Sequence, residues 1–177
     1  MTGFKEWING DETNQMAGFA HVRRMMLGDI QSIDKLGILT AANPNAKKFS
    51  NKKNNSRMQD LATDLRNSGY GPILVDGKYG HEEPSFVVPH LSRQASIDLG
   101  KKFNQHSVIF GEKFVKSDGK PSMKFELIAC ADQNVISTRC ISLSNDYQNN
   151  SDNYSKVKGR KFVIPFFDDE HEDSNCA

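Results

Sequence analysis

The stretch Leu36–Asn45, which reads LGILTAANPN, decides the fold class of this 177-residue chain. It begins as a short apolar run, and Asn43-Pro44-Asn45 closes that run with a turn signal. An apolar run of this length before an Asn-Pro turn is typical of a buried strand, and we expect the strand to end near Thr40. The chain therefore contains a sheet, and the remaining elements are interpreted around this strand.

Three segments around the strand carry the spacing of amphipathic helices. Apolar residues recur at intervals of three to four over about residues 12–27. Ser50 is a suitable N-cap for a second helix, which ends where Gly69 supplies a left-handed residue. Ser92 caps a third helix that continues to about Phe103.

Further strands are expected in short apolar runs separated by turn residues. They span Ile73–Val75, Phe86–Val88, Ser107–Gly111, Met123–Cys130, Val135–Ile141 and Phe162–Phe167. Pro84 and Pro89 flank the run Phe86–Val88, so we expect that strand at an edge of the sheet. The segment Ser142–Lys156 is rich in Ser, Asn and Asp and predicts a loop. This order predicts an α+β fold with a mixed β-sheet, helices mainly on one face, and a β-rich C-terminal part.

The length fits one domain of ordinary size, so we expect a single α+β domain over residues 1–167. The last ten residues, 168–177, carry five acids and no Lys or Arg, which predicts a flexible acidic tail. Residues 1–167 then hold 23 basic and 17 acidic side chains, a net charge of +6. This mildly basic body permits weak contact with a polyanion but is no strong nucleic-acid signature.

Cysteine usage and hydropathy indicate a cytoplasmic protein. No window approaches eighteen apolar residues, and Met1–Gly10 has no apolar core of a secretory signal. Three cysteines without a C-x-x-C pair argue against a disulfide framework and against a structural zinc site. Cys130 and Cys140 flank the expected hairpin turn and either face each other or, as we expect, stay reduced.

Four polar landmarks follow one another along the central part of the chain. They are Thr40-Ala41-Ala42-Asn43-Pro44, Asn54-x-x-Arg57, Glu83-Pro84-Ser85-Phe86 and Phe103-x-Gln105. In this order and spacing they resemble the landmarks of an uncharacterised family of small bacterial and phage domains. The resemblance covers about residues 37–111. Because that family has no established activity, the resemblance implies one recurring domain and a bacterial or phage origin, and it supplies no catalytic residue.

The polar members of these landmarks form the candidate site. Ligands gather beyond strand ends, where helix N-termini present free N–H groups. Arg57 adds a positive charge in the first turns of the second helix, and Glu83 is the one member able to act as a general acid or base. We therefore expect a pocket for a small anionic or nucleotide-like ligand, with enzymatic activity left open. The expected ligand-binding residues are Thr40, Asn43, Asn54, Arg57, Glu83, Ser85 and Gln105.

The same residues also have a structural interpretation. Asn43 before Pro44 builds a turn, and Arg57 pairs with Asp60 or Asp64 on its own helix. Gln105 bridges a helix end to a strand. If this interpretation holds, the landmarks stabilise the fold and bind nothing.

Two functions of other classes remain open. The first is nucleic-acid binding by a basic segment that also holds Phe49, with Lys47, Lys48, Lys52 and Lys53 as the expected contacts. The second is a non-enzymatic module that binds a protein partner through an exposed edge at Glu83–Val88 and the acidic tail. No motif predicts a metal site, a cofactor or a membrane segment.

Overall fold

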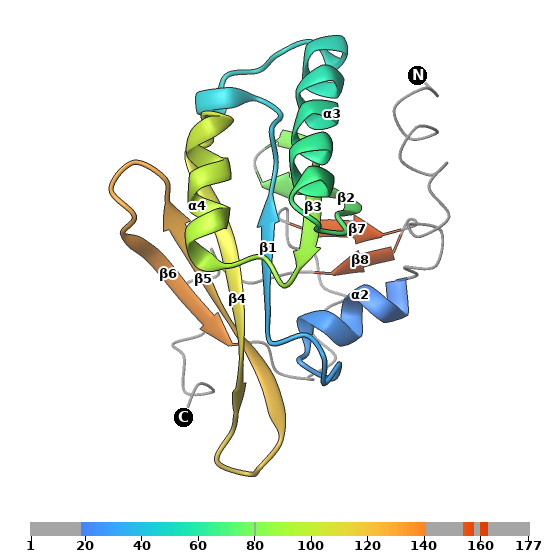
Figure 1. The fold of residues 1–177 in the computed structure, drawn as a ribbon, viewed down its shortest axis with the longest axis vertical. Coiled ribbons are helices and arrows are strands. Elements are labelled where there is room, and N and C mark those ends of the chain that lie inside the picture. The colour runs from blue at the N-terminus through green and yellow to red at the C-terminus, as the bar shows by residue number, and fades with distance from the viewer. Residues whose placement is uncertain (1–18, 80, 141–153, 158–159, 163–177) are drawn as a thin grey trace.

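The computed structural model of the chain describes residues 19–79, 81–140, 154–157 and 160–162 (Figure 1). It confirms the α+β class, with one sheet in the order β6-β5-β4-β1-β3-β2-β7-β8. Each strand pair recorded in this part of the chain is antiparallel, whereas the sequence had suggested a mixed sheet. The strands are β1 (Lys35–Leu39), β2 (Ile73–Tyr79), β3 (His81–Pro89), β4 (Ser107–Val115), β5 (Pro121–Ala129), β6 (Val135–Cys140), β7 (Tyr154–Val157) and β8 (Arg160–Phe162). The helices are α2 (Phe19–Met26), the short 3-10 helix η2 (Pro44–Ala46), α3 (Asn51–Asn67) and α4 (Arg93–Lys102).

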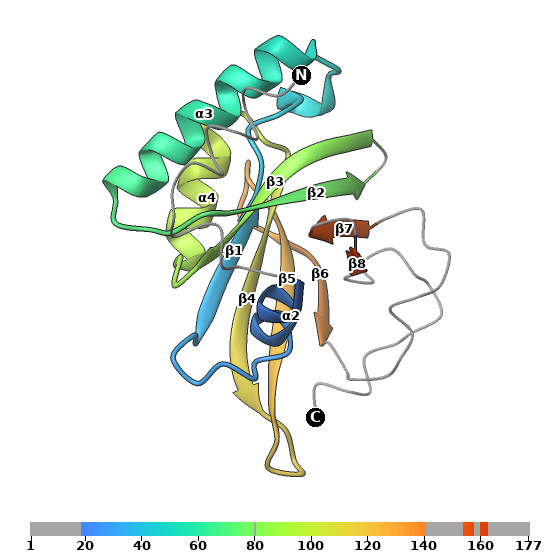
Figure 2. The ribbon, with the colours of Figure 1, turned by 90° about the vertical axis from the view of Figure 1, so that its right-hand side faces the viewer.

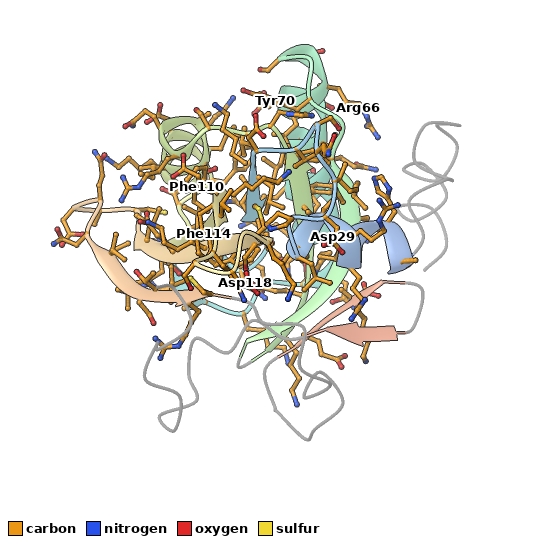
Figure 3. All side chains as sticks on the ribbon, turned by 90° about the horizontal axis from the view of Figure 1, so that it is seen from below. Asp29, Arg66, Tyr70, Phe110, Phe114 and Asp118 are labelled. Carbon is orange, nitrogen blue, oxygen red and sulfur yellow. The ribbon has the colours of Figure 1, made fainter. Side chains whose placement is uncertain are left out.

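The two faces of the sheet carry different helices. In β1, Leu36 and Ile38 point to the cluster that contains α2, and Leu39 points to the cluster beneath α3 and α4. This alternation follows from the period of two in a strand, which sends successive side chains to opposite faces. Figure 2 shows α2 on one side of the strands and the α3–α4 layer on the other. In Figure 3, Phe110 and Tyr70 lie on the side of that helix layer.

The expected N-caps of the second and third helices are confirmed. The Ser50 hydroxyl accepts a hydrogen bond from the backbone N–H of Lys53 at 3.4 Å, at the start of α3. The Ser92 hydroxyl accepts one from the N–H of Ala95 at 3.2 Å, at the start of α4. Each serine satisfies a backbone donor that the first turn of a helix leaves without a partner.

Close packing of α4 on β1 depends on a residue without a side chain. A Cβ placed on Gly37 would lie 2.6 Å from Leu91 Cδ2 and 2.6 Å from Ser96 Oγ. Both neighbours are completely buried and Ser96 belongs to α4, so they have little room to move. Gly37 therefore sets how closely this helix approaches the sheet.

The expected edge position of the strand around Phe86–Val88 is wrong. β3 lies between β1 and β2, and Phe86 and Val87 are completely buried and paired with strands on both sides, so this part of the strand is not an edge. Pro84 is tolerated because β1 pairs with β3 only as far as Phe86. The Pro84 carbonyl accepts a hydrogen bond from the Thr40 hydroxyl and therefore faces away from β2. In an antiparallel strand the N–H and C=O of one residue point to the same side, so the absence of an N–H on Pro84 removes no hydrogen bond between β2 and β3.

Other differences concern the extent of strands. β2 and β3 continue beyond the predicted Ile73–Val75 and Phe86–Val88 and pair with each other along their length. β7 begins within the segment Ser142–Lys156 that predicted a loop and ends one residue beyond it. The polar composition of this segment did not indicate a strand, and β7 depends on its pairing with β2.

Cys130 is a buried free thiol, as expected. Cys140 is disulfide-bonded, so the expectation of a reduced thiol is wrong for this residue. Several expectations lie outside the described residues. These are the first part of the helix at 12–18, most of the loop at 142–156, the strand beyond residue 162, and the acidic tail at 168–177.

The substitution Gly37→Ala should lower the free energy of unfolding by about 1–3 kcal/mol, because the new methyl group overpacks the β1–α4 contact. Urea denaturation followed by circular dichroism measures the change. Gly71→Ala is the matched control, since nothing lies within 4 Å of its added Cβ. A loss for Gly37→Ala no larger than for the control would contradict the assigned packing.

Candidate functional site

The loop between β1 and α3 has an unusual backbone. Asn43, Asn45 and Ala46 have φ angles of 45°, 54° and 57°, in the left-handed region. Asparagine adopts this conformation readily, but an alanine there costs about 1–2 kcal/mol. The loop lies at the top of Figure 1, above α4 and beside the upper end of α3. Because its shape is locally unfavourable, contacts with the rest of the fold must hold it.

Two buried amide side chains bind each other and fix the loop. The Asn54 side chain accepts a hydrogen bond from the Asn43 backbone N–H at 2.9 Å and donates one to Asn43 Oδ1 at 2.9 Å. The same two side chains also bind Phe49, since Asn43 Oδ1 accepts from its N–H at 3.0 Å and Asn54 Nδ2 donates to its carbonyl at 3.4 Å. Both amides are at most 9% exposed, so their polar groups need these partners.

Arg57 binds two backbone carbonyls. Its Nε donates to the Ala41 carbonyl at 2.6 Å, and its Nη2 donates to the carbonyl of Phe103. Its guanidinium also lies over the Phe103 ring, 5.8 Å from the centroid. Ala41 lies just beyond the end of β1 and is completely buried, so its carbonyl has lost its strand partner and needs a donor from elsewhere. Arg57 supplies that donor and joins α3 to the ends of β1 and α4.

The ion pair expected for Arg57 is not what the structure shows. Asp64 instead pairs with Lys102 of α4, at 2.7 Å between its carboxylate and the ammonium. Within the described residues no ion pair is recorded for Arg57. In the part of the chain that the structure describes, its positive charge therefore faces two carbonyl dipoles and an aromatic ring.

Thr40 and Gln105 complete the contacts of the loop. The Thr40 hydroxyl donates to the Pro84 carbonyl at 2.7 Å and accepts from the Ala42 N–H at 3.0 Å. The Gln105 side chain donates to the Ala42 carbonyl at 2.9 Å. Gln105 thus connects the end of α4 to the segment after β1, as the structural interpretation expects.

Glu83 contacts the loop from β3. Its Oε2 accepts a hydrogen bond from Asn43 Nδ2 at 3.0 Å. Burial raises the pKa of Glu83 above its ordinary value of 4.5, and the hydrogen bond from Asn43 offsets part of that rise. Because burial is the larger cause, the folded chain favours the protonated form of this carboxyl more than the unfolded chain does.

The structure thus brings six of the seven expected residues into one hydrogen-bonded cluster. We call it the loop clamp, and it consists of Thr40, Asn43, Asn54, Arg57, Glu83 and Gln105. Ser85 lies on β3 opposite Val75 and is half-buried, without a recorded bond to the clamp. The bonds of the clamp run to other members and to backbone groups of the chain, which is the pattern of residues that hold a loop in place.

Sequence reasoning missed three participants because they act through backbone atoms or sulfur. Met58 Sδ accepts a hydrogen bond from the Ala41 N–H at 3.2 Å. The Phe103 carbonyl binds Arg57, and the Asn104 carbonyl accepts from the Asn45 N–H at 2.8 Å. The sequence held one usable signal, an asparagine just after the third helix, where this residue type often adopts the left-handed conformation. Asn104 does so, with a φ of 53°.

A basic segment lies next to the loop clamp in the chain. The segment Lys47–Lys53 carries four lysines, all exposed, and we call it the lysine loop; its lysines are Lys47, Lys48, Lys52 and Lys53. The Lys53 ammonium lies 4.1 Å from the centroid of the Phe49 ring. Among the described residues none of the four lysines forms an ion pair, and no acidic residue occurs between Asp34 and Asp60.

The described part of the chain holds no group of three or more His, Cys, Asp or Glu side chains arranged to bind a metal ion. None of its helices combines the length and the apolar character that crossing a membrane requires.

Fold and clamp together define a small α+β domain whose β1–α3 loop is fixed by buried polar side chains. Residues 39–108 match the model of a family described as a protein of unknown function (DUF3293). This confirms the resemblance to an uncharacterised domain family over nearly the expected range. The matched segment runs from the end of β1 to the start of β4 and includes all six residues of the loop clamp. No curated protein matches the chain.

Replacing Asn54 tests the clamp. Asn54→Ala should lower the free energy of unfolding by about 1–3 kcal/mol, because it leaves the buried N–H of Asn43 without an acceptor. Chemical denaturation measures the loss. Asn51→Ala, at an exposed position of the same helix, is the matched control and should stay within about 0.5 kcal/mol of the parent. Equal effects of the two substitutions would refute the clamp.

Burial of Glu83 predicts a pH dependence. The folded-state pKa lies above the unfolded value, so the parent loses stability as pH rises from about 4.5 through that folded-state pKa. Glu83→Gln has no charge to bury at any pH. The difference in unfolding free energy, variant minus parent, should therefore increase between about pH 4 and pH 7 in urea titrations. A difference that stays constant or decreases over this range would contradict the assignment.

Proposed function

We propose that this protein binds nucleic acid by contacting its phosphates with Lys47, Lys48, Lys52 and Lys53. The observation that carries the proposal is the exposure of all four lysines on one segment, two in the β1–α3 loop and two in the first turn of α3, which contains no acidic residue. Lysine ammonium groups bind phosphate oxygens and release condensed counterions from the nucleic acid, which is the main source of sequence-independent affinity.

The geometry of the clamp supports this proposal. A flexible basic loop would lose conformational freedom when it binds, and that loss reduces affinity. Here Asn43 and Asn54 hold the backbone of the loop before any ligand arrives. The clamp residues then need no ligand contact of their own, and their role is to position the lysines.

The net charge of residues 1–167 also supports the proposal. Residues 1–167 have a net charge of +6, and the lysine loop contributes four of the positive charges. The carboxylate of the clamp, Glu83, is half-buried and accepts a hydrogen bond from Asn43 Nδ2. The electrostatic field at this end of the molecule therefore attracts a polyanion.

The experiment is fluorescence anisotropy with a labelled oligothymidylate of about 12 nucleotides in a salt titration. Four phosphate contacts on a single strand predict a slope of log affinity against log salt of about −3. Lys47→Glu with Lys48→Glu should weaken binding at low salt by about tenfold or more.

The control is the double variant Lys35→Glu with Lys116→Glu, which changes the net charge equally. Lys35 begins β1, and Lys116 lies in the turn of the β4–β5 hairpin, at the opposite end of the molecule from the lysine loop (Figure 1). This variant should bind nearly as well as the parent. Equal weakening by both double variants would show that net charge alone attracts the oligonucleotide and would contradict a defined surface.

A small anionic or nucleotide-like ligand at the clamp is the second candidate. The observation that favours it is the half-buried guanidinium of Arg57, for which the described residues supply no carboxylate. A ligand of this kind, for which ATP is a suitable probe, should raise the melting temperature of the parent and of the Lys47→Glu, Lys48→Glu variant alike. A rise that depends on those lysines assigns the ligand to the lysine loop.

A further inference from the structure

We propose that Phe49 stacks against an unpaired base, so that the ligand of the lysine loop is single-stranded nucleic acid. The inference rests on the proposed function, because it assumes that the four lysines bind phosphates. It adds the kind of nucleic acid and the residue that recognises it.

The backbone of Phe49 is fixed on both sides. Its N–H donates to Asn43 Oδ1 and its carbonyl accepts from Asn54 Nδ2, so the clamp sets the position of its Cα. A residue held in this way presents its side chain at a defined place on the surface. Such prior fixing reduces the entropy lost when a flat ligand stacks on the ring.

The ring itself has no structural role in the core. Phe49 is partly exposed and belongs to neither of the two hydrophobic clusters, which contain the buried Phe86, Phe103, Phe110 and Phe125. The clamp therefore holds the backbone of an aromatic residue whose side chain lies outside both hydrophobic clusters of the described residues. A partly exposed phenyl ring among lysines is the arrangement found where proteins bind single strands.

The charges around the ring fit a nucleotide. Lys47 and Lys48 precede Phe49 in the chain, and Lys52 and Lys53 follow it after one turn. The Lys53 ammonium, 4.1 Å from the ring centroid, is held there by a weak cation–π contact. A phosphate is a stronger partner for this ammonium, so binding of a strand moves Lys53 from the ring and opens the ring face to a base.

Stacking distinguishes single strands from duplexes. The bases of a duplex are already stacked on each other, and their faces are not available to a surface side chain. Stacking of one base on an aromatic ring changes affinity by about five- to a hundredfold. Phe49 therefore favours an unpaired strand over a duplex of the same phosphate content.

The test compares two labelled probes of equal length and charge: an oligothymidylate and an abasic oligonucleotide with the same phosphates and no bases. The parent should bind the oligothymidylate at least about fivefold more tightly than the abasic strand. Phe49→Leu should remove this difference and leave the affinity for the abasic strand unchanged. Phe49→Trp should keep or increase the difference, which separates stacking from simple hydrophobic bulk.

Each outcome bears on a different part of the argument. If the parent binds both probes equally, the inference is wrong and the proposed function stands. If the parent binds neither probe at low salt, the proposed function is wrong and the inference falls with it. If Phe49→Leu weakens both probes equally, Phe49 shapes the loop and does not stack. A melting temperature close to that of the parent shows that each variant is folded, and Phe49→Trp keeps the test decisive if Phe49→Leu is not.

Discussion

The reciprocal hydrogen bonds between Asn43 and Asn54 are the constraint on which the shape of the β1–α3 loop depends. The loop between β1 and α3 contains left-handed residues, among them Ala46, and would not keep this shape by itself. The two amides bind each other and both backbone polar groups of Phe49. Arg57, Thr40 and Gln105 then satisfy the carbonyls and N–H groups that the end of β1 leaves without strand partners. A satisfied buried network of this kind specifies one conformation, because any alternative leaves polar groups unpaired.

Much of the fold followed from local sequence rules. Ser50 and Ser92 started helices because a hydroxyl satisfies a free N–H at a first turn, whatever the rest of the chain does. The position of β3 did not follow, because the prolines around Phe86 suggested an edge, whereas β1 ends before reaching Pro84. Strand neighbours are set by tertiary pairing, and no rule of spacing gives them from one sequence. β7 was not predicted for a related reason, since it is polar and short and depends on its pairing with β2.

The sequence predicted which residues of the clamp belong together, but not what they do. Arg57 and Glu83 were expected beside one ligand, and the structure connects both to the same loop through Ala41 and Asn43. Their partners are backbone carbonyls and a neighbouring amide, which a sequence does not display. Met58 and Asn104 were missed because a sulfur and a carbonyl carry their contacts. The landmarks of the family-like segment therefore explain how the β1–α3 loop is held in place.

The most direct measurement is an NMR titration of the isotope-labelled protein with oligothymidylate at low salt. The central claim is that a preformed loop, held by Asn43 and Asn54, is the contact surface. The predicted result is a set of backbone amide shifts concentrated at Lys47, Lys48, Phe49, Lys52 and Lys53, with small shifts in the core strands. Shifts concentrated instead on the β4–β5 hairpin or on α2, with the lysine loop unchanged, would contradict the account.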